Sequence, residues 1–511
     1  MVNQGVVCSV DPRASEAGRA VLAAGGNAVD AAIAAGAVLT VVAPHLCGLG
    51  GDLFALVHRP GDQTPASLNA SGRAGSGADP EQLRAEGHTS LPFRGDIRAT
   101  PVPGCVDGWF ALHDRYGTRP MPELLEPAIR LASEGWPATA MLARAGAALE
   151  GVEGAEDLVG LSPGQTVTRV RTAGALRSIA ADGRDGFYLG AFGRGLIEAG
   201  QGLFSESDLE TRQADWEEPL SIDALGHRVW TAAPNSQGYL LLLSLAIADR
   251  LEVPDDPDQA LWAHYLIEAS RQAGYDRPER LSEGADVADL LASAAERAAR
   301  IDPERRADLP DRPRRGGTTY MAVLDREGWG VSYIQSNAAG FGSRLFEPRT
   351  GIGLQNRGVG FNLIPGHPAE YGPGRRPPHT LVPALVTRAD GSLRLIAGTM
   401  GGDSQPQILT QLLSRVLRSG QTAAEAVGAP RWCLHPGPNG FGTWAGPYEF
   451  DIELEASVGE AWRTGLADRG HRIATFPTSS FGHAHLIDVD RDGRAVGAAD
   501  PRAETGTVSV A

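Results

Sequence analysis

The pattern of apolar residues changes abruptly at Thr318, and this change limits the possible folds more than any other feature of the sequence. Upstream segments such as "PELLEPAIRLASEG" carry apolar residues at helical spacing. From Thr318 onward, "TTYMAVLD" and "WGVSYIQSN" alternate apolar and polar residues around the turn "DREG", which is typical of a β-hairpin. "HAHLIDVDRDGRAVGAAD" predicts a second hairpin near the C-terminus. We therefore expect a mostly helical part with some strands, residues 1–317, including a strand after the glycine loop of "HLCGLGGDLFALVHRP". A strand-rich part, residues 318–511, is expected to follow.

Local signals place several helices in the first part and an exposed segment at its end. Residues 16–43 are rich in alanine, and Gly25-Gly26-Asn27 predicts the end of one helix and the start of another. Two more helices are expected at residues 258–273 and 285–300. The segment "IDPERRADLPDRPRRGG" carries charges and prolines every few residues, so we expect it to be exposed and poorly ordered.

The overall composition restricts the class of partner. A chain of 511 residues exceeds the size of one ordinary core, so two lobes are expected. The net charge of −16 argues against a nucleic-acid surface and suits a small-molecule substrate. The longest apolar stretch, residues 31–43, is too short to span a bilayer, and the N-terminus has no pattern of a secretory signal. We expect a cytoplasmic protein that binds neither nucleic acid nor membrane.

Nothing in the sequence indicates a metal ion or another cofactor. His483 and His485 alternate on an expected strand without a third ligand nearby. "DVDRDG" opens like a calcium loop, but its twelfth position is Ala499, so we interpret it as a hairpin turn. "GLGGD" has no following P-loop lysine. The cysteines lack CxxC spacing and are predicted to be buried free thiols; they are Cys8, Cys47, Cys105 and Cys433.

The boundary between the two parts has a chemical interpretation. A threonine hydroxyl is a weak nucleophile, and its own α-amine can serve as the base once the preceding peptide bond has been cut. A free α-amine has a pKa of about 7.7–8.0, so part of it is neutral at pH 7. Gly317, which has no Cβ, can adopt the strained conformation that exposes its carbonyl to the Thr318 hydroxyl. Taken alone, however, Gly316-Gly317 is more simply interpreted as a turn before a strand.

The rest of the chain decides between these two interpretations. In order, it contains "AGGNAVDAAIA", "CGLGGDLFAL", "VPGCVDGWFALHDRYG", "GGTTYMAVLDREG", "SNAAGFGSRLFEPRTGIGLQN", "PGRRPPHTLVPALV" and "GTMGGDSQPQ". In their order and spacing these segments resemble the γ-glutamyltransferase family of N-terminal nucleophile hydrolases over nearly the whole chain. The resemblance implies an α+β fold, a four-layer αββα sandwich in which residues 318–511 supply half of the core.

The resemblance also implies roles for individual residues. Thr318 matches the nucleophile, which becomes a new N-terminus after self-cleavage between Gly317 and Thr318. Ser336 matches a threonine whose hydroxyl bonds the amine of the nucleophile. Gly401 and Gly402 match the glycine pair whose backbone N–H groups form the oxyanion hole. Arg73 matches the arginine that binds the substrate α-carboxylate, for which a guanidinium is suited because it forks onto a carboxylate.

Four positions depart from the family pattern. The acidic residue that holds the substrate α-amino group is replaced by Gly360, and the neighbouring Glu/Gln position is Arg357. The family's serine pair is replaced by His379 and Thr380. This pattern resembles a branch with oxamate amidohydrolase-like and acylase-like members. We expect Arg357 and the carboxylate-binding arginine to leave the pocket net positive, and an aspartate introduced at position 360 to shift the preference toward γ-glutamyl substrates.

The sequence therefore predicts an autoprocessing amidohydrolase that acts on a small acidic amide without a free α-amine. Transfer of the acyl group to an amine is a second outcome of the same chemistry. A true γ-glutamyltransferase or glutathione hydrolase remains an alternative, as does an uncleaved relative that acts as a binding protein. The other expected partners are the large and small subunits of the same chain. Four substrate classes remain open: γ-glutamyl compounds such as glutathione, oxamate-like short amides, acyl side chains of β-lactams, and an unusual bond in a secondary-metabolite pathway.

Overall fold

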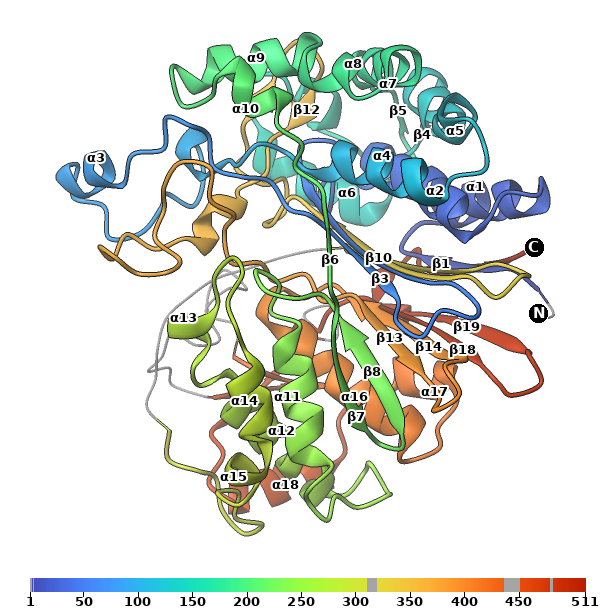
Figure 1. Cartoon of the computed structure of the whole chain (residues 1–511), viewed down its shortest axis with the longest axis vertical. Helices are drawn as coiled ribbons and strands as arrows, with labels where there is room; N and C mark the ends of the chain where they lie inside the picture. The colour runs from blue at the N-terminus through green and yellow to red at the C-terminus, as the bar shows by residue number, and fades with distance from the viewer. Residues whose placement is uncertain (1, 3, 310–318, 436–450, 478–480) are drawn as a thin grey trace.

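The computed structural model describes residues 2, 4–309, 319–435, 451–477 and 481–511, and two β-sheets form its centre (Figure 1). The larger sheet has seven strands in the order β20 (Thr507–Val510), β1 (Val6–Ser9), β9 (Thr319–Leu324), β10 (Gly330–Ser336), β2 (Asp52–His58), β3 (Ala66–Ala70) and β6 (Asp215–Glu217). The smaller sheet has six, in the order β19 (Ala495–Ala499), β18 (Ala484–Val489), β14 (Leu393–Thr399), β13 (Ala384–Thr387), β8 (His227–Thr231) and β7 (Leu220–Ala224).

Strands from both parts of the sequence alternate within the larger sheet. β9 lies between β1 and β10, and β10 in turn pairs with β2, all antiparallel. The predicted hairpins are confirmed as β9–β10 and β18–β19. The strand expected after the glycine loop is β2, and the described residues of the first part contribute six strands to the two sheets: β1, β2, β3, β6, β7 and β8.

The two sheets pack face to face through alternate residues of their strands. In β9, Tyr320, Ala322 and Leu324 face the smaller sheet, where Trp230 and Ile396 belong to the same buried cluster. The intervening side chains of β9 point the other way and join the larger helical core. β9 is therefore buried on both faces, which explains why "TYMAVL" is almost continuously apolar and does not alternate with polar residues as expected.

Helices cover the outer face of each sheet (Figure 1). The break predicted at Gly25-Gly26-Asn27 is confirmed: Gly25 has φ +86°, and the Asn27 side chain caps the next helix. The helix expected at 285–300 is instead two short helices, α14 (Ala288–Ala292) and α15 (Ala294–Ala298). The larger sheet is covered by α1 (Pro12–Ala23), α2 (Ala28–Val42) and α4 (Cys105–Tyr116), and α5 (Met121–Glu134) packs on α2. The smaller sheet is covered by α11 (Tyr239–Ala248), α16 (Gln405–Leu417) and α17 (Ala423–Gly428), and α12 (Ala260–Gly274) packs on α11.

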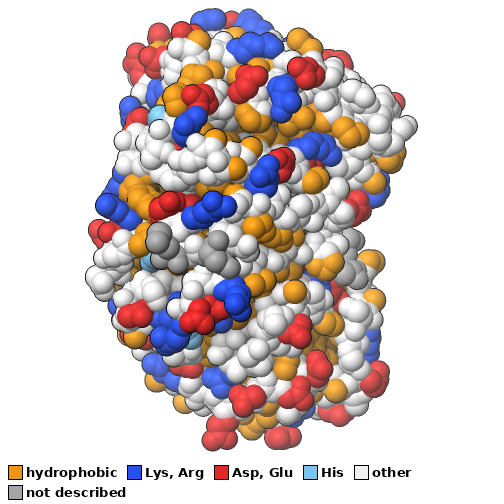
Figure 2. Space-filling model, turned by 90° about the vertical axis from the view of Figure 1, so that its right-hand side faces the viewer, with side chains coloured by type: hydrophobic (Ala, Val, Ile, Leu, Met, Phe, Trp, Pro, Cys, Tyr) orange, Lys and Arg blue, Asp and Glu red, His pale blue; other side chains and the backbone are white. Residues whose placement is uncertain are grey.

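Other sequence predictions concern thiols, membranes and charge. All four cysteines lie among the described residues and are buried and free, as predicted. In the part of the chain that the structure describes, no helix is both long and apolar enough to cross a bilayer. On the face drawn in Figure 2, Arg side chains are interspersed with Asp and Glu side chains.

Candidate active site

The predicted site residues gather where one end of each sheet meets the loops that follow it. Ser336 is the last residue of β10, and its register partner in β2 is Asp52. Gly401 and Gly402 follow β14 and precede α16. Hydrogen bonds between side chains then connect this edge to the segment 377–380. The grouped residues are far apart in the sequence, and the tertiary fold brings them together.

Arg357 occupies the centre of the group. It begins the short 3-10 turn η4 (Arg357–Gly360) and is only 1% exposed. Its Nη1 donates to Thr380 Oγ1 at 3.0 Å and its Nη2 to Ser336 Oγ at 3.2 Å. Burial lowers the pKa of Arg357 to about 10, while the charges of Asp52 and Asp403 oppose this shift. The guanidinium therefore stays charged at neutral pH. It bonds both Ser336, which is matched to the residue that holds the nucleophile's amine, and Thr380, which is matched to a substrate-binding residue.

His379 lies beside this cation but carries no charge itself. Its Nε2 donates to Asp52 Oδ2 at 3.1 Å, and its Nδ1 accepts the N–H of Leu381 at 3.3 Å. Burial lowers the pKa of His379 to about 3, and the positive charge of Arg357 acts in the same direction. Asp52 Oδ1 is held in turn by Gln355 Nε2 at 2.8 Å. The pair is thus a fixed, fully buried unit in which the carboxylate orients a neutral imidazole.

Gly401 and Gly402 form a turn that only glycine adopts easily. Their φ angles are +141° and +59°, both in the region that disfavours other residues. Within the described part of the chain, no hydrogen bond occupies the backbone N–H of either glycine. The turn leads directly into α16, whose N-terminal end adds a favourable partial charge for an anion. These features suit an oxyanion hole, although the assignment itself stays a prediction.

The surroundings of Arg73 correct one expectation. Its Nη1 pairs with Glu283 Oε1 at 2.6 Å and its Nη2 with Asp215 Oδ2 at 3.4 Å. Arg376 nearby pairs with Asp215 and Glu217. Two arginines therefore face three carboxylates, and the expectation of net positive charge is wrong at this end of the group. The acidic partners lie far away in the sequence, so a local pattern could not reveal them.

The structure also limits what can be placed at position 360. A Cβ added to Gly360 would lie 2.4 Å from the carbonyl oxygen of Pro378, well inside contact distance. The glycine is therefore required by the close approach of two backbones. Gly360→Asp can therefore add an acidic contact only if the segment 377–380 moves, and the expected shift toward γ-glutamyl substrates stays a prediction.

The predicted nucleophile Thr318 and the cleavage site after Gly317 lie outside the described residues. Strand β9 starts at Thr319, whose register partner is Gln335, the residue before Ser336. The predicted bond between Ser336 and the nucleophile's amine therefore stays a prediction. Sequence reasoning missed Asp52, for which its place after the glycine loop "CGLGG" was an available signal. It also missed Gln237, Arg277 and Asp403, of which only Asp403 adjoins a recognised motif.

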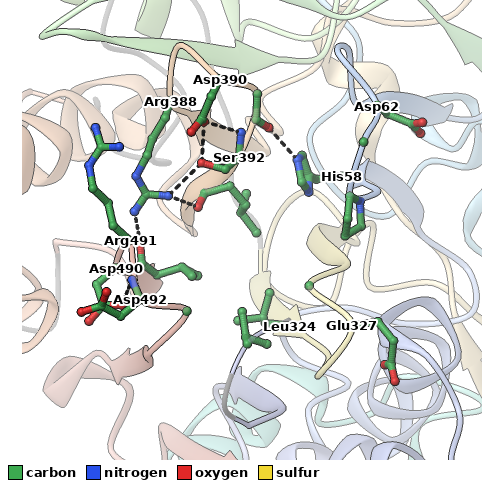
Figure 3. Close-up of a pocket in the computed structure, with 18 of the residues that line it drawn as sticks. His58, Asp62, Leu324, Glu327, Arg388, Asp390, Ser392, Asp490, Arg491 and Asp492 are labelled. Carbon is green, nitrogen blue, oxygen red and sulfur yellow. Dashed lines mark hydrogen bonds between the residues drawn. The ribbon is translucent and has the colours of Figure 1, made fainter.

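A described cavity of about 450 Å³ lies away from these residues (Figure 3). Its lining includes His58, Arg388 and Asp490, at the opposite ends of β2, β13 and β18 from the site residues. It is thus distinct from the candidate active site.

Among the residues described, no cluster of three or more His, Cys, Asp or Glu side chains could hold a metal ion. Burial lowers the pKa of His483 to about 4 and that of His485 to about 3.

Comparison with known proteins identifies the family. The family model "Gamma-glutamyltranspeptidase" matches residues 14–510. The chain is 35% identical to the oxamate amidohydrolase proenzyme of Klebsiella pneumoniae subsp. pneumoniae, covering 96% of this chain and 95% of that one. It is 33% identical to the glutathione hydrolase-like YwrD proenzyme of Bacillus subtilis, covering 97% of each. The crystal structure of cephalosporin acylase from Bacillus halodurans superposes with a TM-score of 0.89 at 32% identity, covering 99% of this chain and 96% of the other. The protein is therefore an enzyme of the gamma-glutamyltranspeptidase family, with the mixed helix-and-sheet fold of its acylase relatives.

Proposed function

We propose that this enzyme cleaves itself between Gly317 and Thr318 and then hydrolyses a small acidic amide through an acyl-enzyme on Thr318. Its relatives with 35% and 33% identity are both named proenzymes, which supports self-processing. One of them is named an oxamate amidohydrolase, which supports an acidic amide as the substrate class. The resemblance of "GGTTYMAVLDREG" to the family's motif supports Thr318 as the nucleophile.

The buried cation Arg357 is the observation that carries the substrate class. Its guanidinium is fixed between Ser336 and Thr380, and these two acceptors are neutral hydroxyls. A carboxylate or a second carbonyl of the substrate can accept charge-assisted hydrogen bonds from such a group. A substrate ammonium beside the same cation would be repelled in a site of low dielectric. An acidic acyl group that lacks the α-amine therefore suits this position better than a γ-glutamyl group.

The proposed reaction assigns one step to each group. The neutral α-amine of Thr318 takes the proton of the Thr318 hydroxyl as the oxygen attacks the amide carbonyl. The resulting oxyanion accepts hydrogen bonds from the N–H groups of Gly401 and Gly402. The C–N bond then breaks, the leaving amine takes the proton, and an ester on Thr318 remains. Water, deprotonated by the same amine, hydrolyses that ester and releases the acid.

We assign residues 1–317 to a large subunit and 318–511 to a small subunit that share one four-layer αββα core. The position of β9 between β1 and β10 supports this assignment, because the larger sheet takes neighbouring strands from both parts. The packing of the two sheets on each other, with helices outside, supports the layer order. Cleavage after Gly317 is therefore expected to leave the two parts tightly associated.

A γ-glutamyl hydrolase is the second candidate, and one observation favours it. Glu283 and Asp215 flank Arg73, so both a carboxylate-binding cation and two anions are present at that end of the group. An α-amino acid group needs both signs of charge. A relative in Bacillus subtilis, 27% identical over 97% of this chain, is named a glutathione hydrolase. Glutaryl and γ-glutamyl anilides, which differ only in the α-amine, distinguish the two candidates.

The test uses purified wild type, Thr318→Ala and, as a matched control, Thr319→Ala. We expect two bands on a denaturing gel that sum to the 53.6 kDa chain, and one species on size exclusion. Thr318→Ala is expected to remain one band and to lose turnover of glutaryl p-nitroanilide, while Thr319→Ala retains both activities. A single band with no turnover of either anilide in the wild type favours a binding protein. Full activity in uncleaved Thr318→Ala eliminates the mechanism.

A further inference from the structure

Gln237 connects two parts of the candidate site through its side chain. It lies between β8 and α11, is completely buried, and donates its backbone N–H to the carbonyl of His379 at 2.9 Å. Its Nε2 donates to the carbonyl oxygens of Thr380, at 3.1 Å, and of Gly402, at 3.0 Å. One amide group thus holds the segment matched to substrate binding against the turn matched to the oxyanion hole.

Arg277 holds the side-chain amide of Gln237 in place. It begins α13 (Arg277–Arg280) and is 5% exposed. Its Nε donates to Gln237 Oε1 at 3.0 Å, and its Nη2 donates to Asp403 Oδ1 at 3.1 Å. Asp403 directly follows Gly402. The Arg277 guanidinium therefore bonds both the residue after the turn and the glutamine that bonds the carbonyl of Gly402. We call Arg277 and Gln237 together the strut.

The chemistry of the strut requires a glutamine. Carbonyl oxygens only accept hydrogen bonds and a guanidinium only donates them, so the group between them must do both. An amide does so in a single orientation, with Nε2 toward the carbonyls. A glutamate of the same shape keeps the contact with Arg277 but turns a carboxylate oxygen toward two carbonyl oxygens. Gln237→Glu therefore removes the donors while changing almost no volume.

The turn needs such support because its backbone is intrinsically free. Two consecutive glycines at φ +141° and +59° have many accessible conformations, and no side chain of their own restricts them. Fixing the carbonyl of Gly402 fixes the peptide plane that follows it and restricts the plane that carries its N–H. An oxyanion hole is effective only when its donors are already in place before the charge develops.

We propose that Gln237, held by Arg277, is a positioning residue that sets the geometry of the Gly401-Gly402 turn in the acyl-transfer step. The proposal rests on the proposed function, because it needs an oxyanion at that turn. Gln237→Glu leaves in place the backbone bond to the carbonyl of His379 and the bond from Arg357 to Thr380, which hold the substrate-binding segment. We therefore expect kcat to change while KM stays nearly unchanged. A shift of the order of 1 Å in such a site can cost about a hundredfold in rate.

The experiment compares Gln237→Glu with Gln411→Glu. Gln411 is a matched control because its Nε2 also donates to two backbone carbonyls, of Gln407 and Trp432, while it lies further along α16. For Gln237→Glu we expect kcat for glutaryl p-nitroanilide to fall about ten- to a hundredfold with KM within about threefold. Affinity for the boronic acid in which boron replaces the glutaryl carbonyl carbon is expected to fall in parallel, and affinity for glutarate to stay unchanged.

Two further results complete the test. Arg277→Lys, which leaves the amide in place but holds it less firmly, is expected to give a smaller loss of the same kind, and it carries the test if Gln237→Glu does not fold. The proposal is overturned if Gln237→Glu and Gln411→Glu lose kcat equally, or if boronate and glutarate affinities change together. A wild type that cleaves no amide contradicts the proposed function instead, so the two failures are distinguishable.

Discussion

Replacing Arg357 by methionine tests the substrate class directly. Methionine has a similar length and no charge, and the site is 1% exposed, so water does not fill the place of the guanidinium easily. The substitution removes the hydrogen bonds to Ser336 Oγ and Thr380 Oγ1 together with the cation that we propose meets the acidic end of the substrate.

The size of the effect follows from the hydrogen bonds that the guanidinium would donate to the substrate. A hydrogen bond to a charged group contributes about 1.5–3 kcal/mol, which corresponds to a factor of roughly ten to 150 in kcat/KM for each such bond. The stability of the fold should change much less. A buried guanidinium costs desolvation free energy, as its lowered pKa of about 10 indicates, and an apolar replacement recovers part of that cost.

The assay measures kcat/KM for glutaryl p-nitroanilide and for neutral butyryl p-nitroanilide. We expect Arg357→Met to lower the ratio of the first to the second by about ten- to 150-fold, with the unfolding midpoint in urea nearly unchanged. Arg357→Lys keeps the charge without the planar fork and is expected to give an intermediate ratio. An equal loss for both anilides would show that Arg357 supports the site only structurally and would refute the charge argument.

Two more predictions concern position 360 and pH. Gly360→Asp, and equally Gly360→Ala, should lower the unfolding midpoint, because a Cβ would lie 2.4 Å from the oxygen of Pro378; an unchanged midpoint would contradict this. Burial lowers the pKa values of His45, His379 and His485 to about 3, below the unfolded value of about 6.5, so the unfolded chain binds more protons at acidic pH. The contribution of each histidine to the free energy of unfolding should therefore be full above about pH 6.5 and should decrease by about 1.4 kcal/mol per pH unit below it. Equal unfolding midpoints at pH 7.5 and 5.5 would refute this.

Features that depend on neighbouring residues could be predicted from the sequence. The break at Gly25-Gly26-Asn27 and the hairpins β9–β10 and β18–β19 depend on local turn chemistry. The grouping of Ser336, Arg357 and Thr380 followed from the family resemblance, and the structure shows them bonded to one another. Most strands of the first part were not predicted individually, because several are short and a short apolar run does not distinguish a strand from a helix.

Features that join distant segments could not be predicted in this way. Arg73 meets Glu283 across 210 positions of the sequence and Asp215 across 142. Gln237 reaches Gly402 across 165 positions. No local motif encodes such a contact, since each partner alone is an ordinary charged or polar residue. The charge expected around Arg73 was wrong for this reason.

The departures from the family pattern are not independent, and this has a consequence for engineering. Arg357 and Gly360 bound one short turn; Arg357 bonds Thr380, and Gly360 packs on the carbonyl of Pro378. His379, between them, is fixed by Asp52, which lies opposite Ser336 in the sheet. Each replacement therefore supports the next one. A single exchange toward the family residue removes a partner or creates a clash. If the proposed function is correct, we therefore expect γ-glutamyl specificity to require replacement of the turn 357–360 and the segment 377–380 together.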